Sequence, residues 1–473
     1  MPAFLPSSLF RRHNMRSHRS SHPHSATHFI LYTLVLFSSS SGTVLARKVD
    51  PLIQLPRTLP SRNRHVSKRV LLVDDHGARG DGFSDDTDAF KKVWKKACSL
   101  RAPSRIKIPD GKTYLVGPID LSGPCRSKVT LQISGSIVAP EDPQLWDGLN
   151  PHKWLYFHGV NHLTLEGRGR INGMGRKWWA QSCKTNSTNP CQPAPTAITF
   201  HRCKNLRIQY LTVIDSPKMH IAFTNCLQVK ASNLTVIAPR ASPNTDGVHI
   251  SASRAIEVEN TMIRTGDDCI SIVSNSSGVT IKNIICGPGH GISKLCSRSA
   301  SIGSLGKWNS LSEIRNVIVD GAILSNTDNG VRIKTWQGGS GFASDIVFQN
   351  VWMENVSNPI IIDQYYCDSF LPCRNQTESV KVKNIVFMHI KGTSATEAAI
   401  TFACSDESPC EGLYLEDIEL VSHAGGLTRA LCWQAYGDTL GVVYPPVPCF
   451  SDANDNSFME QKGDSRISAP SFR

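Results

Sequence analysis

Short segments of the form apolar-polar-apolar recur along most of this chain, and this repeat is the feature that most limits the fold. Each segment has the alternation expected of a strand with one buried face. The closest segments lie about 21 to 23 residues apart, and wider gaps near 29 or 40 leave room for loop insertions. The segments are Leu163–Leu165, Leu206–Ile208, Leu227–Val229, Ile256–Val258, Val279–Ile281, Ile346–Phe348, Ile385–Phe387 and Leu413–Leu415. A repeat of twenty-odd residues with about three short strands is typical of a solenoid coil.

Among solenoids, this pattern favours a parallel β-helix. Leucine-rich repeats need a regular Leu/Asn pattern, propeller blades need a longer period, and helical repeats need helical periodicity, and the chain has none of these. One segment, residues 87–98, does have helical spacing of its apolar residues Phe90, Val93, Trp94 and Ala97. It is the only helix that we predict in the folded part, and we expect it to cap the N-terminal end of the stack. We therefore predict an all-β fold, a single domain spanning residues 69–455.

The first 46 residues have the pattern of a secretory signal peptide. Four arginines precede a short apolar run, and small residues follow it up to Ala46. The alternative, a membrane anchor, needs a longer apolar run. Residues 47–68 are predicted to be a linker or propeptide and residues 456–473 a C-terminal tail. The mature chain is thus expected to be secreted and to hold no membrane segment.

The charge of the chain points to an acidic partner. The formal net charge is +12, and removal of Arg11, Arg12, Arg16 and Arg19 lowers it to +8. A basic secreted protein suits a polyanion such as an acidic polysaccharide. The chain has no Lys/Arg tract interleaved with aromatic residues, so we expect no nucleic-acid partner. We expect a monomer.

The fifteen cysteines indicate disulfides, as is common in secreted chains. Three close pairs have spacings that suit local loop staples: Cys183 and Cys191, Cys367 and Cys373, and Cys404 and Cys410. The odd number predicts at least one cysteine that is unpaired or bonded between chains. Five Asn-x-Ser/Thr sequences are compatible with glycosylation: those at Asn186, Asn233, Asn275, Asn355 and Asn375.

Four polar clusters interrupt the apolar repeats: 242–247 with Asn244 and Asp246, 265–269 with Asp267 and Asp268, 287–291 with His290, and 332–334 with Arg332 and Lys334. Asp246, Asp268 and His290 follow one another at intervals of 22 residues, which is close to one coil. Residues one coil apart stack on the same face of a solenoid, so these side chains are expected to converge. Carboxylates packed this closely resist simultaneous ionisation, so at least one keeps its proton near neutral pH.

A protonated acid beside an ionised base is the pair that glycoside hydrolysis requires. Arg332 and Lys334 alternate about Ile333, so on a strand both point to one side, where they could bind a substrate carboxylate. Taken singly, each cluster has a simpler interpretation: a turn, a solvated acidic pair or calcium site, a glycine loop, and a surface strand. Their joint occurrence at the repeat spacing favours an active site.

In this order, the four clusters resemble the signatures of glycoside hydrolase family 28, the polygalacturonases, and most closely the plant members. The resemblance extends from about Val70 to Phe450 and includes Ser216-Pro217 with His220, and Asp363 to Cys367. It implies a right-handed parallel β-helix that hydrolyses α-1,4-galacturonosyl linkages of pectin with inversion. It implies no metal and no organic cofactor.

The resemblance also implies a role for each site residue. Asp267 corresponds to the general acid, and Asp246 and Asp268 hold and activate the water. His290 supports the protonation of the acid or the geometry of the site. The predicted substrate-binding residues are Arg332, Lys334, Tyr366, with Tyr365 as the alternative, and Asn244, which either orients Asp246 or contacts substrate. His220 and His249 are expected to be structural or peripheral, and Cys269 is expected to pair with Cys286.

The sequence departs from the family pattern after His290. In relatives the Gly-His-Gly-Ile-Ser motif runs directly into Ile-Gly-Ser-Leu-Gly, whereas here residues 294–301, including Cys296, lie between them. These eight residues are either a splice-boundary or gene-model error, an unusual isoform, or a real insertion that displaces His290 or closes a subsite. Three other functions stay open: a rhamnogalacturonan or xylogalacturonan hydrolase, a calcium-dependent pectate lyase of the same fold, and a wall-binding protein impaired by the insertion.

Overall fold

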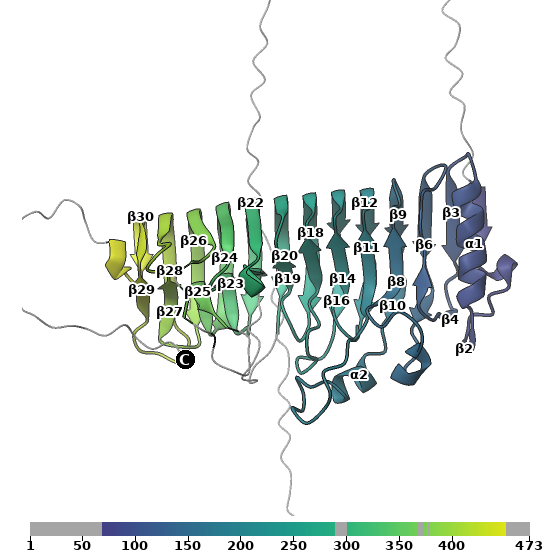
Figure 1. Ribbon diagram of the computed structural model, residues 1–473, viewed down its shortest axis with the longest axis horizontal. Helices are drawn as coiled ribbons and strands as arrows, with labels where there is room; N and C mark the ends of the chain where they lie inside the picture. Colours follow the sequence, from purple (N-terminus) through teal and green to yellow (C-terminus); the bar gives the residue numbers. More distant parts are fainter. Residues whose placement is uncertain (1–68, 289–299, 368–372, 374, 377, 451–473) are drawn as a thin grey trace, which may run out of the picture. The chain divides into compact units, whose positions relative to one another are not determined.

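The computed structural model describes residues 69–288, 300–367, 373, 375–376 and 378–450 (Figure 1). The predicted signal peptide, the linker at 47–68 and the tail at 456–473 lie outside these residues. So do His290, Cys296 and most of the 294–301 insertion.

The described chain is built from strands stacked coil upon coil, and every pairing between its named strands is parallel. The smaller sheet follows the order of the chain: β5 (Ile119–Asp120), β8 (Lys153–His158), β11 (Thr196–His201), β14 (Ile221–Thr224), β17 (Val248–Ser251), β19 (Ile270–Ile272), β21 (Ala300–Leu305), β23 (Asn329–Trp336), β25 (Asn358–Tyr366), β27 (Ala398–Ala403) and β29 (Arg429–Trp433).

The larger sheet holds the remaining strands: β1 (Arg69–Leu72), β2 (Asp81–Asp85), β3 (Ser104–Ile108), β4 (Thr113–Leu115), β6 (Val129–Ile133), β7 (Ser136–Val138), β9 (Leu163–Glu166), β10 (Arg170–Asn172), β12 (Lys204–Gln209), β13 (Thr212–Ile214), β15 (Leu227–Ser232), β16 (Thr235–Ile237), β18 (Arg254–Arg264), β20 (Ser276–Cys286), β22 (Leu311–Ser325), β24 (Ser340–Val356), β26 (Lys381–Ser394), β28 (Cys410–Ser422) and β30 (Ala435–Tyr444). This is the parallel β-helix expected from the repeat, and the predicted fold class is confirmed.

All eight predicted segments lie on strands of the larger sheet, where their apolar residues form continuous inner rows. One such row runs through Leu206, Val229, Ile256 and Val279, each pairing with the next. For one segment, Leu227–Val229, the predicted alignment with the preceding coil is two residues too early. In the structure, Val229 and Ala231 pair with Leu206 and Ile208 of the preceding coil. The prediction missed this register because Ala231, although buried, is a small residue with a weak hydrophobic signal.

The space between the sheets is a core of aliphatic and aromatic side chains. Phe157, Phe200 and Phe223, on three successive strands of the smaller sheet, stack with centroid separations of 5.0 and 5.6 Å. Offset stacking of this kind adds to the hydrophobic free energy of burial. Such stacks fix the register of the coils, because a shift by one residue would turn each buried side chain outward.

The predicted capping helix is observed as α1 (Thr87–Ser99). Phe90, Val93, Trp94 and Ala97 are buried, as their spacing predicts. The Trp94 ring packs 5.6 Å from Phe157, and its indole N–H donates to the carbonyl oxygen of Ser122 at 3.0 Å. These contacts cover the N-terminal end of the core.

A second helix, α2 (Arg176–Ala180), was not predicted. Its five residues are too few to show a helical period, so no sequence signal identified it. Within the described ranges, four short 3-10 turns accompany the helices: Asp74–His76, Pro143–Trp146, Lys307–Asn309 and Pro448–Phe450. None of the helices in the described ranges has the length and apolar character to cross a bilayer.

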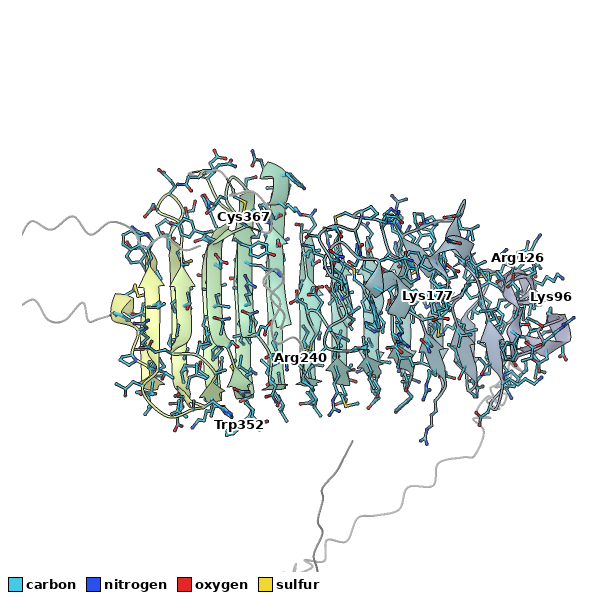
Figure 2. The ribbon with its side chains drawn as sticks, turned by 90° about the horizontal axis from the view of Figure 1, so that it is seen from below. Lys96, Arg126, Lys177, Arg240, Trp352 and Cys367 are labelled. Atoms are coloured by element: carbon cyan, nitrogen blue, oxygen red, sulfur yellow. A yellow bond between two sulfur atoms is a disulfide. The ribbon has the colours of Figure 1, made fainter. Side chains whose placement is uncertain are left out.

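The outer face of the larger sheet carries an exposed apolar row. Ile285, Ile323 and Trp352 pair in sequence across β20, β22 and β24, and the half-buried Met262 of β18 pairs with Ile285. Trp352 is 53% exposed and is labelled on the outer surface in Figure 2.

Six disulfides join described cysteines. The three predicted loop staples are present, as is the Cys269–Cys286 bond that the resemblance implied. Two further bonds join Cys98 to Cys125 and Cys432 to Cys449. Cys203 and Cys226 are buried free thiols, so the described part of the chain already contains unpaired cysteines, as the odd number predicted.

Candidate active site

The predicted acidic residues meet at the start of two neighbouring strands. Asp246 lies just before β17 and Asp268 just before β19, and Val248 pairs with Ile270 between these strands. The backbone N–H of Gly247 donates to the carbonyl oxygen of Asp268 at 2.9 Å. The 22-residue spacing therefore places the two acids one coil apart on one face, as predicted.

Two glycines allow the acidic turns to approach this closely. A Cβ on Gly266 would lie 2.0 Å from the carbonyl oxygen of Ser242 in the preceding turn. A Cβ on Gly247 would lie 2.6 Å from the carbonyl oxygen of Cys269. Any side chain at either position would push the turns apart, so these glycines are required by packing.

The three carboxylates are almost fully buried, with 4–7% of each residue exposed. One oxygen of Asp267, Oδ1, accepts the backbone N–H of Asp268 at 2.8 Å. The amide of Asn244 donates to the other oxygen at 3.4 Å. Asn244 thus contacts Asp267 directly, in addition to flanking Asp246 in sequence.

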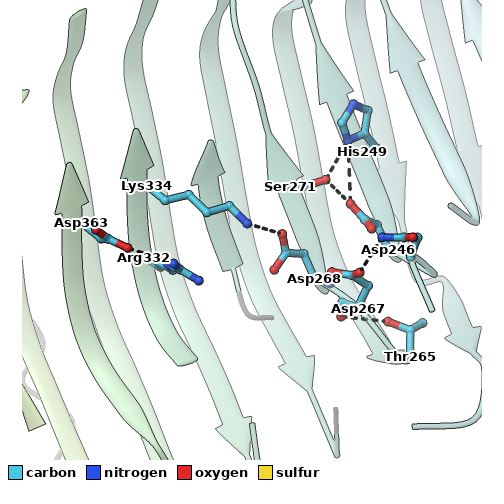
Figure 3. Close-up of polar contacts among 10 residues, drawn as sticks. Asp246, His249, Thr265, Asp267, Asp268, Ser271, Arg332, Lys334 and Asp363 are labelled. Atoms are coloured by element: carbon cyan, nitrogen blue, oxygen red, sulfur yellow. Dashed lines mark hydrogen bonds and ion pairs between the residues drawn. The ribbon is translucent and has the colours of Figure 1, made fainter. Parts of the chain in front are cut away.

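Two cations line the site from β23. Arg332 and Lys334 are 5% and 6% exposed and point to one side of the strand, as their alternation predicts. The ammonium of Lys334 lies 3.4 Å from Oδ2 of Asp268, and Nη2 of Arg332 lies 3.3 Å from Oδ2 of Asp363 (Figure 3). The acid cluster and the cation pair therefore form one connected site.

Tyr366 lies against both cations. The Arg332 guanidinium carbon is 5.1 Å and the Lys334 ammonium 5.3 Å from the centre of its ring, within the range of cation–π attraction. The hydroxyl of Tyr365 instead donates to Asp406 at 3.3 Å. Of the two tyrosines considered from the sequence, Tyr366 is the one beside the cations.

Arg332 has hydrogen-bonding capacity to spare. Its Nε and Nη1 are buried and have no partner among the described residues. Buried donors without partners are costly, so such groups usually serve a ligand or a water. A guanidinium in this state is suited to bidentate binding of a carboxylate.

The surroundings shift the pKa of two carboxyl groups in opposite directions. Burial alone raises the pKa of Asp246, but contacts with His249 and Ser271 and the charge of Lys334 outweigh it, so the net pKa is lowered. Burial raises the pKa of Asp363, and the nearby charge of Arg332 offsets only part of this effect.

Three residues of the site were missed or undervalued from the sequence. Asp363 was noted as part of the resemblance but given no role, and it pairs with Arg332. Ser271 donates to Oδ2 of Asp246 at 2.6 Å, and His249 Nδ1 lies 2.8 Å from Oγ of Ser271. For His249 and Ser271, the available sequence signal was their separation of 22 residues, which equals the separation of Asp246 and Asp268.

His220 matches the structural role expected for it. It is fully buried, its Nδ1 contacts the carbonyl oxygen of Asp246 at 3.0 Å, and burial lowers its pKa to about 4. A neutral imidazole here supports the backbone of the acidic turn. His290 lies outside the described residues, so its predicted role stays a prediction.

The acidic pair is poorly suited to the alternative of a calcium site. Calcium requires several oxygen ligands, and here an ammonium already lies beside Asp268, where it would repel a second cation. Elsewhere in the described chain, His389, Glu416 and Asp417 bring ligand atoms within 4.8 Å of one another on strands β26 and β28. That group lies on the larger sheet, away from the acids.

Comparisons with known proteins agree with this geometry. The family described as "Glycosyl hydrolases family 28" matches residues 98–435. The chain is 56% identical to a probable polygalacturonase of Arabidopsis thaliana over 441 residues, covering 93% of this chain and 97% of that protein. It is 46% identical to polygalacturonase-2 of Solanum lycopersicum, covering 91% and 98%.

Solved structures share the fold at low sequence identity. An endo-xylogalacturonan hydrolase from Aspergillus tubingensis has a TM-score of 0.66 at 24% identity, covering 77% of this chain and 96% of that one. A polygalacturonase from Erwinia carotovora has a TM-score of 0.60 at 22% identity, covering 72% and 91%. These two likenesses bear on the fold alone.

Proposed function

This chain belongs to the glycosyl hydrolases of family 28, and from that premise we propose that it is a polygalacturonase that cleaves α-1,4-galacturonosyl linkages of pectin with inversion. As a family member it is a glycoside hydrolase. The observation that carries the proposal is the union of three buried carboxylates with Lys334 and Arg332 in one site.

The charges around each carboxyl group bear on which one acts as the general acid and which ones activate water. Lys334 pairs with Asp268 and favours its charged form, and the pKa of Asp246 is lowered, so Asp246 is ionised near neutral pH. Negative charges this close oppose ionisation of all three carboxyl groups at once, and the family resemblance assigns the remaining proton to Asp267. Asp267 is thus the general acid, and Asp246 and Asp268 are the acceptors for a proton of water.

In the proposed reaction, Asp267 protonates the glycosidic oxygen as its bond to the anomeric carbon breaks. A water held by Asp246 and Asp268 attacks that carbon from the opposite face and gives up a proton to the carboxylates. The product sugar has inverted configuration at the anomeric carbon. The proton taken from water later restores the acid.

The cations select an acidic sugar. The unpartnered donors of Arg332, the ammonium of Lys334 and the ring of Tyr366 form a site for the carboxylate of a galacturonate unit. A neutral sugar would leave Nε and Nη1 of Arg332 without a hydrogen-bond acceptor, and this disfavours its binding. The net charge of the chain favours approach of the polyanion.

The leader-like residues 1–46, the disulfides and the plant relatives support secretion and action in the plant cell wall. Pectin is then the macromolecular partner. A monomer suffices, because all the described site residues come from one chain.

The test is an assay of the purified mature chain on de-esterified polygalacturonate without added calcium. New reducing ends and the ultraviolet absorbance of unsaturated uronides are followed together, with Asp267→Asn as the control. We expect reducing ends without absorbance, and loss of the signal in the variant. Absorbance instead would identify a lyase, and no signal of either kind would contradict polygalacturonase activity.

A further inference from the structure

His249 and Ser271 form a short chain of hydrogen bonds that ends on Asp246. They are paired residues on β17 and β19, with their side chains on the outer face of the smaller sheet. Ser271 Oγ lies 2.6 Å from Oδ2 of Asp246, and His249 Nδ1 lies 2.8 Å from Oγ of Ser271 (Figure 3). His249 Nδ1 is also 3.8 Å from the same carboxylate oxygen.

The direction of these hydrogen bonds follows from the chemistry of the groups. An ionised carboxylate only accepts, so the single hydroxyl proton of Ser271 points at Asp246. The serine oxygen must then accept from His249, which places a proton on Nδ1 of the imidazole. The tautomer of His249 is thereby fixed by its neighbours.

This arrangement makes the two oxygens of Asp246 different. Within the described residues, the side-chain contacts of Asp246 fall on Oδ2. Oδ1 is therefore the oxygen left to hold a water. Because Ser271 is 3% exposed, water does not readily replace its hydroxyl, and loss of this bond would leave Oδ2 poorly solvated.

We propose that Ser271 and His249 are positioning residues of the hydrolytic reaction: they anchor Oδ2 of Asp246 so that Oδ1 faces the attacking water. This inference rests on the proposed function, in which Asp246 takes part in activating that water. It assigns His249 a role in the reaction, in contrast to the structural or peripheral role expected from the sequence.

The test compares Ser271→Ala with Ser271→Thr, which keeps the hydroxyl. We expect Ser271→Ala to lower kcat by about tenfold to a hundredfold, the range for a lost hydrogen bond to a charged group, with KM nearly unchanged. The acidic limb of its kcat–pH profile should move to higher pH, because Asp246 loses a donor that favours its ionised form. Ser271→Thr should resemble the unmodified enzyme in both respects.

His249 offers a second test that does not depend on a buried substitution, since its side chain is 18% exposed. His249→Asn places an amide N–H near the position of Nδ1, whereas His249→Gln places it near Nε2. We expect His249→Asn to retain most of kcat, and His249→Gln and His249→Leu to lose about tenfold. Thermal unfolding of every variant identifies any that fails to fold.

The inference and the function on which it rests fail in different ways. An unmodified enzyme that releases no reducing ends would refute the function. An active enzyme in which Asp246→Asn is dead, while folded Ser271→Ala or His249→Leu keeps the kcat and pH profile of the unmodified chain, would overturn the positioning role alone. A fall in kcat without movement of the acidic limb would also overturn it.

Discussion

The ammonium of Lys334 lies 3.4 Å from Oδ2 of Asp268, although 66 residues separate the two in sequence. Two strands of the smaller sheet, β19 and β23, bring them together across β21. Both side chains are more than nine-tenths buried, so each neutralises a charge that would otherwise be poorly solvated.

Replacing Lys334 by methionine should therefore reduce both stability and turnover. Removing one partner of a buried pair costs roughly 3–5 kcal/mol of unfolding free energy, because the other charge stays buried. We expect the second change, Asp268→Asn, to recover part of this stability in the double variant while activity stays lost. Urea unfolding of the four proteins in this cycle measures the coupling, and purely additive losses would refute the pairing.

Stability at acidic pH should depend on Asp246. Its pKa is lowered in the folded chain from an unfolded value of about 3.9, so the stability that it contributes is present above that value. This contribution is lost as the pH falls through the folded-state pKa. Chemical unfolding of the unmodified chain and of Asp246→Asn should therefore differ less at pH 3 than at pH 6. A difference that does not change with pH would contradict the lowered pKa.

Tyr366 and Tyr365 provide a matched pair. Tyr366→Ala should raise KM for polygalacturonate about tenfold, because the ring packs beside Arg332 and Lys334. Tyr365→Ala should leave KM within about twofold, since the hydroxyl of Tyr365 contacts Asp406. Steady-state kinetics on oligogalacturonides distinguishes the two, and equal effects would show that the cation–π contacts are not used in binding.

The Cys269–Cys286 disulfide should matter for both stability and turnover. It closes a separation of 17 residues next to Asp268, which corresponds to about 3 kcal/mol of stability in the chain-entropy model. Cys183–Cys191 closes a separation of 8 residues and serves as the control, with about 2.5 kcal/mol. We expect only the first Cys→Ser pair to lower kcat after both proteins are shown to fold. Equal kcat values for the two would contradict this local role.

Deletion of residues 294–301 should preserve the β-helix. Ala300 and Ser301 pair with Val331 and Arg332, and the deletion brings Ile292 and Ser293 to these two positions with the same apolar-polar order. We expect unfolding cooperativity to be retained and kcat/KM on polygalacturonate to rise. A deletion variant that folds but loses activity would show that the insertion contributes to the site.

The sequence predicted the fold and the placement of most candidate site residues, because both depend on one period. The 22-residue interval aligned Asp246 with Asp268, and alternation about Ile333 placed Arg332 and Lys334 on one side. The same interval relates His249 and Ser271, but each alone is an ordinary strand residue, so only the observed hydrogen bonds give them a role.

Other features could not be predicted, for identifiable reasons. The register at Leu227 depended on Ala231, whose small side chain gives little hydrophobic signal although it is fully buried. Helix α2 is too short to show a period. Asp363 is the ion-pair partner of Arg332 because the register of β23 and β25 places Asp363 opposite Lys334, two residues from Arg332. Spacing within one segment of the sequence does not encode this register.

The stacking of coils has a consequence for how such enzymes diversify. Neighbouring strands of a parallel sheet lie about 4.8 Å apart, so the outer face of the smaller sheet lengthens by a fixed increment with each coil. Duplication or loss of a whole coil outside β17–β25 would change how much polymer this face can contact, while the acids and cations kept their positions. In this architecture, the length of substrate that the enzyme contacts and the residues that break the bond can therefore evolve independently.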